Sequence, residues 1–243
     1  QGDILWSGGF GTLGAYKELM EPYKSPDLAA IPAEFRGPDN LWVGTNVHLM
    51  VIMVNEKQLK GLPVPKTWSD LMKPEWKGKF AITDPSKSAT AYMLVYGLLK
   101  QFGREGLEKI AANAVVTSSS GTTYKGTATG EYPVGLTIEY AAQEYVAGGQ
   151  KEIRLVYPSE GSYLAPEGMF IFKGAKNAEA AKAFYNILLS KETQEELLVK
   201  AFRRPTRTDI QVSKLTSLPD IKSVKIFPLS QEAASAEYEQ LVS

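Results

Sequence analysis

The sequence predicts an α/β fold, because short apolar segments alternate along the chain with segments of helical pattern. Residues 41–55 (LWVGTNVHLMVIMVN) are apolar and rich in β-branched side chains, which is typical of a buried strand. This segment is long enough to cross between two lobes. Since no low-complexity linker divides the chain, we expect strands to act as the hinges.

The N-terminal elements follow from local composition. Residues 4–6 are apolar and predict a short strand, and the glycines of residues 8–14 predict a tight turn. Residues 12–20 favour a helix, whereas prolines make residues 21–40 irregular.

The spacing of apolar residues and the presence of capping residues predict the remaining elements. Thr67 or Ser69 is a suitable N-cap for a short helix, and Ser190 is a suitable N-cap for the helix after it. Residues 118–123 are polar and predict a loop. Further strands are expected at 79–83, 134–138, 153–157 and 168–172. Further helices are expected at 88–102, 105–112, 124–129, 141–147, 178–189, 191–202 and from 231.

Composition excludes several classes of protein. The 243 residues include 27 basic and 27 acidic side chains, and no basic cluster exceeds Arg203-Arg204 with Arg207, so nucleic acid is not an expected partner. The absence of cysteine excludes a disulfide scaffold and a thiolate metal site. No His/Cys cluster has metal-ligand spacing, and we expect no cofactor.

Residues 9–14 (GFGTLG) match the dinucleotide pattern G-x-G-x-x-G. An NAD-dependent oxidoreductase is therefore an alternative function. The full fingerprint needs a second parallel strand, and the prolines of residues 21–26 argue against one there. The same glycines also fit an anion site at a helix start, or a plain strand-to-helix turn.

Two hydroxyl-rich segments precede predicted helices. Residues 84–90 (DPSKSAT) follow a strand, and their hydroxyls suit either helix capping or a ligand. Residues 118–123 (SSSGTT) place five hydroxyls around one glycine, which suits a phosphate or a polyol, or a solvated loop. The candidate ligand-binding residues in these segments are Ser88, Thr90, Ser119, Ser120, Gly121 and Thr122.

Other candidates are charged or aromatic residues near strand ends. His48, the only histidine, lies in the long strand and is either a hydrogen-bonded structural residue or a ligand contact. Glu139 and Tyr140 follow the strand at 134–138, and Glu160 follows the strand at 153–157, at the carboxyl ends where α/β sheets bind ligands. Arg204 suits phosphate or carboxylate, or complements a helix dipole. We assign no catalytic residue.

Eight short segments, spread nearly end to end, carry a family resemblance. They are DILWSGG (3–9), LMEPY (19–23), TWSDL (67–71), PEWKGK (74–79), GEYPVGLT (130–137), APEG (165–168), KGAKN (173–177) and LSKE (189–192). In this order they resemble the type II periplasmic binding proteins of the ferric-iron, phosphonate and sugar-phosphate branch.

The resemblance implies a periplasmic or extracellular receptor that delivers a small molecule to the permease of an ABC transporter. Two α/β lobes with mixed sheets would close over the ligand, since contacts with both lobes favour the closed state. Lobe one is expected at 1–47 and 164–210, and lobe two at 48–163 and 211–243. The resemblance assigns Ser7, Gly8 and Gly9 to the ligand face of lobe one, and places Arg204 near its rim.

A departure from the family pattern predicts the class of the ligand. Ferric-iron binders of this branch use two adjacent tyrosines, whereas this chain has Glu139-Tyr140. We therefore expect a phosphorylated or polyol-like anion, with ferric iron as the alternative, because a hard trivalent metal favours phenolates and carboxylates. An interaction or sensor module that uses the same fold is a third possibility.

A second departure concerns the N-terminus. The resemblance places about 60 residues before the DILW strand, within the usual size of a lobe, and they are not in this sequence. Lobe one is therefore expected to be incomplete, and self-association or domain swapping is expected to cover its exposed apolar surface.

Overall fold

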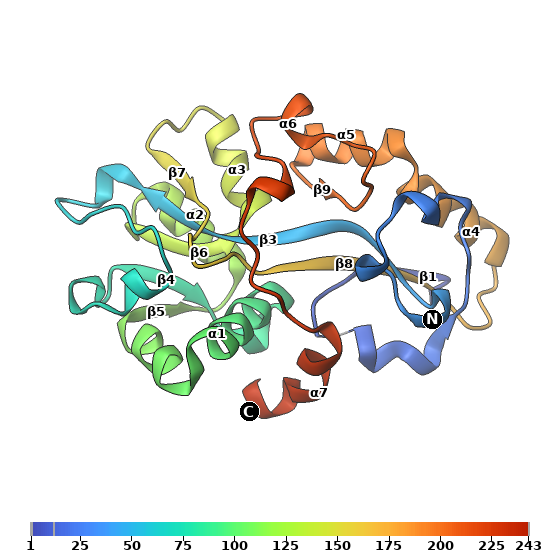
Figure 1. Ribbon diagram of the computed structural model, residues 1–243, viewed down its shortest axis with the longest axis horizontal. Coiled ribbons are helices and arrows are strands. Elements are labelled where there is room, and N and C mark those ends of the chain that lie inside the picture. The colour runs from blue at the N-terminus through green and yellow to red at the C-terminus, as the bar shows by residue number, and fades with distance from the viewer. Residues whose placement is uncertain (1, 12, 243) are drawn as a thin grey trace. The chain divides into compact units, whose positions relative to one another are not determined.

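The computed structural model describes residues 2–11 and 13–242 of the chain. Helices and strands alternate along it, which confirms the predicted α/β class (Figure 1). The chain forms two compact units that share the long strand β3 (Val43–Asn55), all of whose residues are buried. Unit 1 comprises Gln1–His48, Ala165–Ile221 and Gln231–Ala236, and unit 2 comprises Leu49–Leu164, Lys222–Ser230 and Glu237–Ser243.

The sheet of unit 1 is built around β8 (Leu164–Phe172), which lies next to β3. Strands β1 (Ile4–Gly8) and β2 (Met20–Glu21) both pair antiparallel with β8. Strand β9 (Arg204–Pro205) pairs antiparallel with the first half of β3. Strand β8 begins at Leu164, four residues before the predicted strand at 168–172, and it includes Pro166.

Two clusters of apolar side chains cover the two faces of β8. Met169 and Ile171 pack in one cluster with α4 (Ala178–Leu189), whereas Phe170 packs in another with Leu13. This alternation is the period of two that a strand imposes on its side chains. The sheet of unit 1 is therefore buried on both faces of β8.

The glycine-rich turn does not build a dinucleotide-binding unit. Residues Leu13–Leu19 form a short 3-10 helix, η1, and Thr12 of the turn lies outside the described residues. Strand β8 lies between β1 and β2 and runs antiparallel to both. A dinucleotide fold needs two adjacent parallel strands joined by a helix at this point. The oxidoreductase interpretation of residues 9–14 is therefore wrong.

Residues 211–221 group with unit 1, whereas the sequence assigned them to lobe two. The physical reason is a cluster in which Val212 and Leu218 pack against Leu198 and Ile210.

The remaining helical elements of unit 1 are η2 (Pro26–Ala30), η3 (Ala33–Phe35), η4 (Pro38–Asn40), α5 (Lys191–Ala201) and α6 (Val212–Leu215). Helix α7 (Gln231–Val242) contributes residues to both units, and η9 (Ile221–Ser223) lies at their boundary in the chain.

The sheet of unit 2 is mixed, as predicted. Strand β4 (Phe80–Thr83) lies between β5 (Ala114–Thr117) and β6 (Val134–Ile138), and the three run parallel. The second half of β3 pairs antiparallel with β6 and with β7 (Ile153–Val156). The parallel part therefore has all its carboxyl ends on one edge.

Three helices follow the parallel strands of unit 2. Helices α1 (Ala89–Asn113), α2 (Ser120–Thr129) and α3 (Glu139–Ala147) come after β4, β5 and β6. The chain passes outward from β4 to β5 and back to β6, so right-handed crossovers place α1 and α2 on opposite faces of the sheet (Figure 1). The two helices predicted at 88–102 and 105–112 form α1 and are separated by a break at Gly103. The short 3-10 helices of this unit are η5 (Glu56–Gln58), η6 (Ser69–Met72), η7 (Pro74–Trp76) and η8 (Pro85–Lys87).

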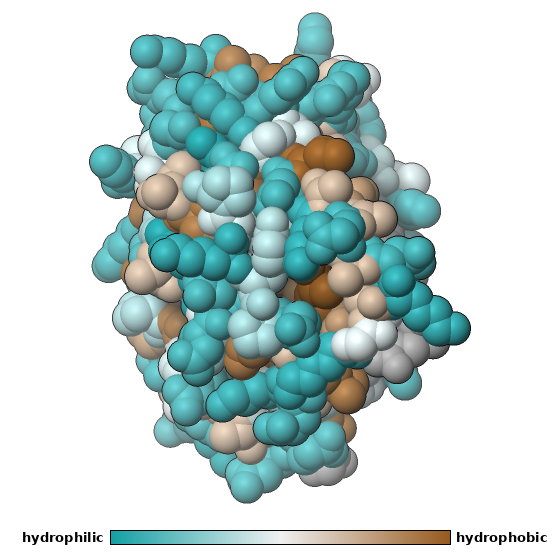
Figure 2. Space-filling view, turned by 90° about the vertical axis from the view of Figure 1, so that its right-hand side faces the viewer, coloured by the Kyte–Doolittle hydropathy of each residue, from teal (hydrophilic) through white to brown (hydrophobic). Residues whose placement is uncertain are grey.

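One face of unit 1 is mostly hydrophilic. Figure 2 shows this face with hydrophobic residues in separate small spots. The exposed apolar side chains include Trp6 and Phe184, whose rings meet edge to face at 6.2 Å. Over residues 2–11 and 13–242, no helix combines the length and the apolar character that a membrane span requires.

Candidate functional site

The carboxyl edge of β4, β5 and β6 brings the N-termini of α1, α2 and α3 to one side of the unit 2 sheet. Each helix start carries N–H groups without an intrahelical acceptor, together with the positive end of the helix dipole. Such an edge is the usual ligand position of an α/β sheet and favours an anion. The backbone thus provides the first part of the candidate site.

Hydroxyl groups join the starts of α1 and α2. The Oγ of Ser120 donates to the Oγ of Ser88 at 3.0 Å, and the Oγ of Ser88 lies 2.8 Å from the Oγ1 of Thr90. Although Ser88 is the N-cap of α1, its side chain makes no capping hydrogen bond, so capping alone does not explain this hydroxyl. All three side chains are partly exposed. We call Ser88, Thr90 and Ser120 the hydroxyl cluster.

Two other predicted residues shape the start of α2. Ser119 is its N-cap, since its Oγ accepts from the N–H of Thr122 at 3.1 Å. The Oγ1 of Thr122 lies 2.9 Å from the same oxygen, and both side chains are exposed. The predicted loop at 118–123 is shorter than expected, because α2 already begins at Ser120. Gly121 lies in the first helical turn, where an added Cβ would meet only ordinary contacts of 3.7 Å or more.

A buried layer of threonines supports the hydroxyl cluster. The Oγ1 of Thr123 lies 2.8 Å from that of Thr83 at the end of β4, and 2.7 Å from that of Thr117 at the end of β5. All three side chains are buried. These bonds fix α2 to both strands. The sequence reasoning missed the layer, because each threonine lies within a different element and only the pairing of β4 with β5 brings them together.

Glu139 provides a carboxylate at the same edge. It is the first residue of α3, it is 2% exposed, and the hydroxyl of Tyr157 donates to its Oε1 at 2.6 Å. An acidic side chain at this position complements the helix dipole. The start of α3 is therefore occupied by its own acidic side chain, and the starts of α1 and α2 are the ones suited to an added anion. Tyr140, the next residue, is partly exposed.

Unit 1 contains a separate cluster of charged residues around Glu167. The Oγ of Ser7 donates to Oε1 of Glu167 at 2.6 Å, and Nη1 of Arg203 donates to Oε2 at 3.1 Å. The Nε2 of His48 lies 3.4 Å from the same Oε2 and 3.2 Å from Nη1 of Arg203. We call Ser7, His48, Glu167 and Arg203 the Glu167 cluster.

In the Glu167 cluster, the pKa of Glu167 is lowered by its neighbours and the backbone of Ser7 is strained. Burial opposes ionisation of Glu167, but hydrogen bonds from His48 and Ser7 and the charge of Arg203 outweigh it and lower the pKa of Glu167 to about 2. Ser7 has a φ of 96°, which is unfavourable for a residue with a Cβ, and it lies at an irregularity in the pairing of β1 with β8. Its hydrogen bond to Glu167 helps to hold that conformation.

The sequence predicts two of the four residues of this cluster, Ser7 and His48, but not Glu167 or Arg203. A signal for Glu167 was present, since an acidic side chain inside the apolar strand LAPEGMFIF is rarely buried without a partner. Arg203 gave no such signal beside Arg204. The structure places Arg204 in β9, where it is 2% exposed.

The other predicted residues lie in different surroundings. Gly8 pairs with Gly168 in the sheet of unit 1, and Gly9 follows β1. The carboxylate of Glu160 accepts from the N–H of Ser69 at 3.1 Å and from its Oγ, so it caps the start of η6. The carbonyl of Glu160 accepts from Gln101, about three turns from the start of α1. The structure therefore does not bring Glu160 to the hydroxyl cluster, and gives it a structural role instead.

Acidic residues and the histidine are otherwise dispersed. Within the described part of the chain, no group of three or more His, Cys, Asp or Glu side chains is arranged to hold a metal ion. The donors at the carboxyl edge of unit 2 are hydroxyls and main-chain N–H groups, which suit the oxygen atoms of an anion or a polyol.

Comparison with known proteins gives related sequences over most of the chain. A family model described as bacterial extracellular solute-binding protein matches residues 3–227. An uncharacterized protein of Haemophilus influenzae is 31% identical over 215 residues, which cover 80% of this chain and 60% of that protein. A Fe(3+)-binding periplasmic protein of Serratia marcescens is 26% identical over 192 residues, which cover 74% of this chain and 56% of that protein. The chain thus spans less than two thirds of the length of these relatives.

A solved structure is similar over the full chain. It is the periplasmic binding protein AfuA from Actinobacillus pleuropneumoniae with exogenous fructose-6-phosphate bound. The sequence identity is 28% and the TM-score is 0.87, and the alignment covers 100% of this chain and 81% of that one.

Proposed function

We propose that this chain, which belongs to the bacterial extracellular solute-binding proteins, binds a small anionic solute for import. Its membership of this family confirms the resemblance seen in its sequence. In this proposal the solute leaves chemically unchanged, and the partner is the permease of an ABC transporter. The place of action is the periplasm or the cell exterior. In this proposal units 1 and 2 serve as the two lobes of such a receptor.

The observation that carries the proposal is the hydroxyl cluster. Ser88 and Ser120 connect the first turns of α1 and α2 through side chains that are partly exposed and that do not cap either helix. An anion at this position would accept from hydroxyls and from main-chain N–H groups at once. Ser7 and His48 of unit 1 remain predicted ligand contacts.

The proposed ligand class is a phosphorylated or polyol-like organic anion. Neutral donors at two helix starts suit a phosphate, and the carboxylate of Glu139 suits the hydroxyl groups of a sugar. The similarity to AfuA, whose structure contains fructose-6-phosphate, supports this choice. Arg204 and Tyr140 remain predicted ligand contacts.

Ferric iron is the second candidate ligand. The relative from Serratia marcescens is a Fe(3+)-binding protein, and Tyr140 follows Glu139 directly at the same sheet edge. Phenolate and carboxylate oxygens are ligands that suit a hard trivalent ion. If iron is the ligand, Tyr140→Phe abolishes its binding, whereas removal of the hydroxyl cluster has little effect.

The test is calorimetric titration of the 243-residue chain with inorganic phosphate, fructose-6-phosphate, fructose and ferric citrate. We expect fructose-6-phosphate or a related phosphate ester to bind and ferric citrate not to bind. The double variant Ser88→Ala with Ser120→Ala is expected to weaken binding by about 10- to 100-fold, because each lost hydrogen bond contributes roughly 0.5–1.5 kcal/mol. Thr129→Ala, at the opposite end of α2, is the control. Unchanged affinity in the double variant would remove the hydroxyl cluster from the site.

Self-association or domain swapping stays a prediction from the sequence. Light scattering of the purified chain at several concentrations checks it.

A further inference from the structure

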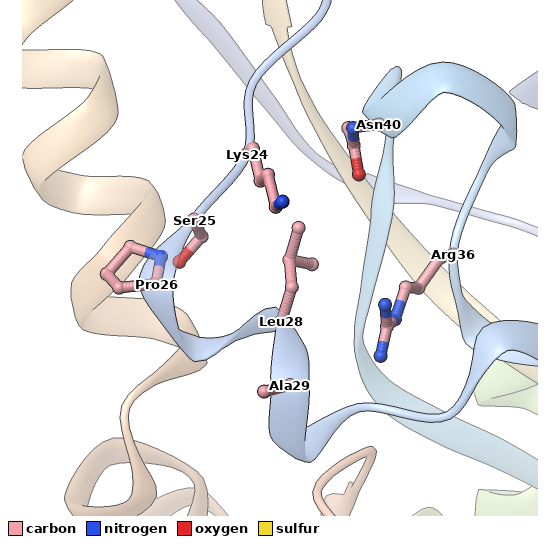
Figure 3. A pocket seen from close by; sticks show the side chains of 7 residues that line it. All are labelled: Lys24, Ser25, Pro26, Leu28, Ala29, Arg36 and Asn40. Atoms are coloured by element: carbon pink, nitrogen blue, oxygen red, sulfur yellow. The ribbon is translucent and has the colours of Figure 1, made fainter.

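A pocket of about 490 Å³ lies in unit 1, and its lining shares no residue with the hydroxyl cluster or the Glu167 cluster. Its volume is within the range of roughly 300–1,000 Å³ that is usual for small-molecule sites. Figure 3 shows the side chains around it. They are Lys24, Ser25, Pro26, Leu28, Ala29, Arg36 and Asn40.

The walls of this pocket are fixed to the body of unit 1. Ser25 is 2% exposed and caps η2, since its Oγ accepts from the N–H of Asp27 at 3.2 Å. Leu28 is 5% exposed and packs in the same core cluster as α4. The N–H of Tyr23 donates to the carbonyl of Asn40 at 3.0 Å, which ties the two ends of the lining segment together. The pocket is therefore preformed.

Two cations enter this pocket without an acidic partner. Neither Lys24 nor Arg36 forms an ion pair with a carboxylate of residues 2–11 or 13–242. Arg36 donates through Nε to the carbonyl of Ile31 at 2.7 Å, and Nη2 donates to the same oxygen. The nearby carboxylate of Asp27 is neutralised by Arg207, whose Nη1 lies 2.7 Å from Oδ1.

The side chains are arranged so that charge and apolar surface meet. Figure 3 shows Lys24 and Arg36 directed toward the same space from different segments, with the amide of Asn40 beside it. Leu28 and Ala29 of η2 line the pocket with apolar surface. The bond to Ile31 fixes the guanidinium of Arg36 and leaves its Nη1 donors for another acceptor.

We propose that this pocket binds a small carboxylate that carries an apolar group. A carboxylate matches the planar guanidinium of Arg36 and the charge of Lys24. The apolar group would cover the exposed side chains of Pro26 and Ala29 and remove that surface from water. This site is separate from the one proposed for the transported solute, so the two are tested independently.

The probe is sodium octanoate, with octanol as an uncharged analogue of similar chain length and inorganic phosphate as an anion without an apolar group. Binding is followed by the amide signals of residues 24–40 in two-dimensional NMR spectra of the 243-residue chain. Octanoate is expected to shift these signals saturably, whereas octanol and phosphate do not. Equal binding of octanol would overturn the role of charge, and binding of phosphate in place of octanoate would overturn the ligand class. Absence of saturable shifts from octanoate would overturn the site itself.

Two variants separate binding from folding. Lys24→Gln with Arg36→Gln is expected to weaken octanoate binding by about tenfold or more, which is the effect of losing roughly 1.4 kcal/mol of interaction. Ala29→Trp keeps both charges and fills the exposed mouth of the pocket, so it is expected to block the probe. Lys17→Gln, outside the pocket, is the control. Full octanoate affinity in Ala29→Trp, with its melting temperature unchanged, would contradict the proposal.

Discussion

Glu167 shows how a single buried carboxylate is made stable in unit 1. Its partners Ser7, His48 and Arg203 offset the cost of burial and hold its pKa at about 2, below the ordinary value of 4.5. Because the folded-state pKa is the lower one, the carboxylate stabilises the fold fully above about pH 4.5. That contribution is lost as the pH falls toward 2, and its full size is on the order of 3 kcal/mol.

The matching prediction concerns acid stability. Glu167→Gln is expected to lower the free energy of unfolding at pH 7 by about 3 kcal/mol, since it leaves Arg203 without its carboxylate partner. The variant should also lose less stability than the wild type between pH 4.5 and pH 2. Urea unfolding at a series of pH values measures both effects. Glu34→Gln, at an exposed acid, is the control, and parallel pH curves for the wild type and Glu167→Gln would contradict the assignment.

At the scale of elements, the break in α1 depends on one glycine. Gly103 has φ 68° and ψ −177°, a conformation that residues with a Cβ adopt only under strain. It separates two helical stretches that the sequence already predicted as distinct. Nothing lies within 4 Å of an added Cβ, so the cost of a substitution is conformational and not steric.

Gly103→Ala is therefore expected to destabilise the protein by about 1–3 kcal/mol. Gly121→Ala is the matched control, because it lies in a helical turn with room for a Cβ and is expected to be neutral or to stabilise by up to roughly 1 kcal/mol. Differential scanning calorimetry compares the two variants. Equal melting temperatures would show that the backbone at Gly103 relaxes without cost.

Elements with a strong local signal were predictable. The long apolar run gave β3, and the capping serine of α5 was identified, since the Oγ of Ser190 accepts from the N–H of Thr193. Residues 13–20 were less clear, because Met20 belongs to a two-residue strand that depends on pairing with β8, and Leu13 of η1 packs against Phe170 of the same distant strand. The same limit applies to the site. Helix starts and hydroxyls are local features, whereas the contacts of Glu167 with Arg203 depend on the distant pairing of β9 with β3.

At the scale of the whole molecule, β3 belongs to both units. The boundary between them falls after His48, inside a strand that is buried at all 13 positions. Its first half pairs with β9, and its second half pairs with β6 and β7. Opening either half would break hydrogen bonds and expose apolar surface, so we expect local opening of β3 to be rare.

Hydrogen exchange tests this expectation. Amides of residues 44–48 and 49–55 should exchange at similar slow rates, governed by global unfolding. The amides of the two-residue strand β2 should exchange much faster and serve as the internal reference. Early exchange confined to residues 44–48 would indicate that unit 1 opens by itself.

In unit 2, the buried threonine layer below the hydroxyl cluster holds α2 in place, and the side chains above it are exposed or partly exposed. Thr83, Thr117 and Thr123 anchor helix α2 to the strands, and Ser119 caps the helix and accepts from Thr117 through its carbonyl. The exposed side chain of Thr122 takes no part in that anchoring, so it can be altered with little disturbance to the residues beneath it. A receptor that binds its solute at this edge, as we propose, is therefore a suitable starting point for engineering a biosensor, by randomising Thr122 and leaving Thr83, Thr117 and Thr123 intact.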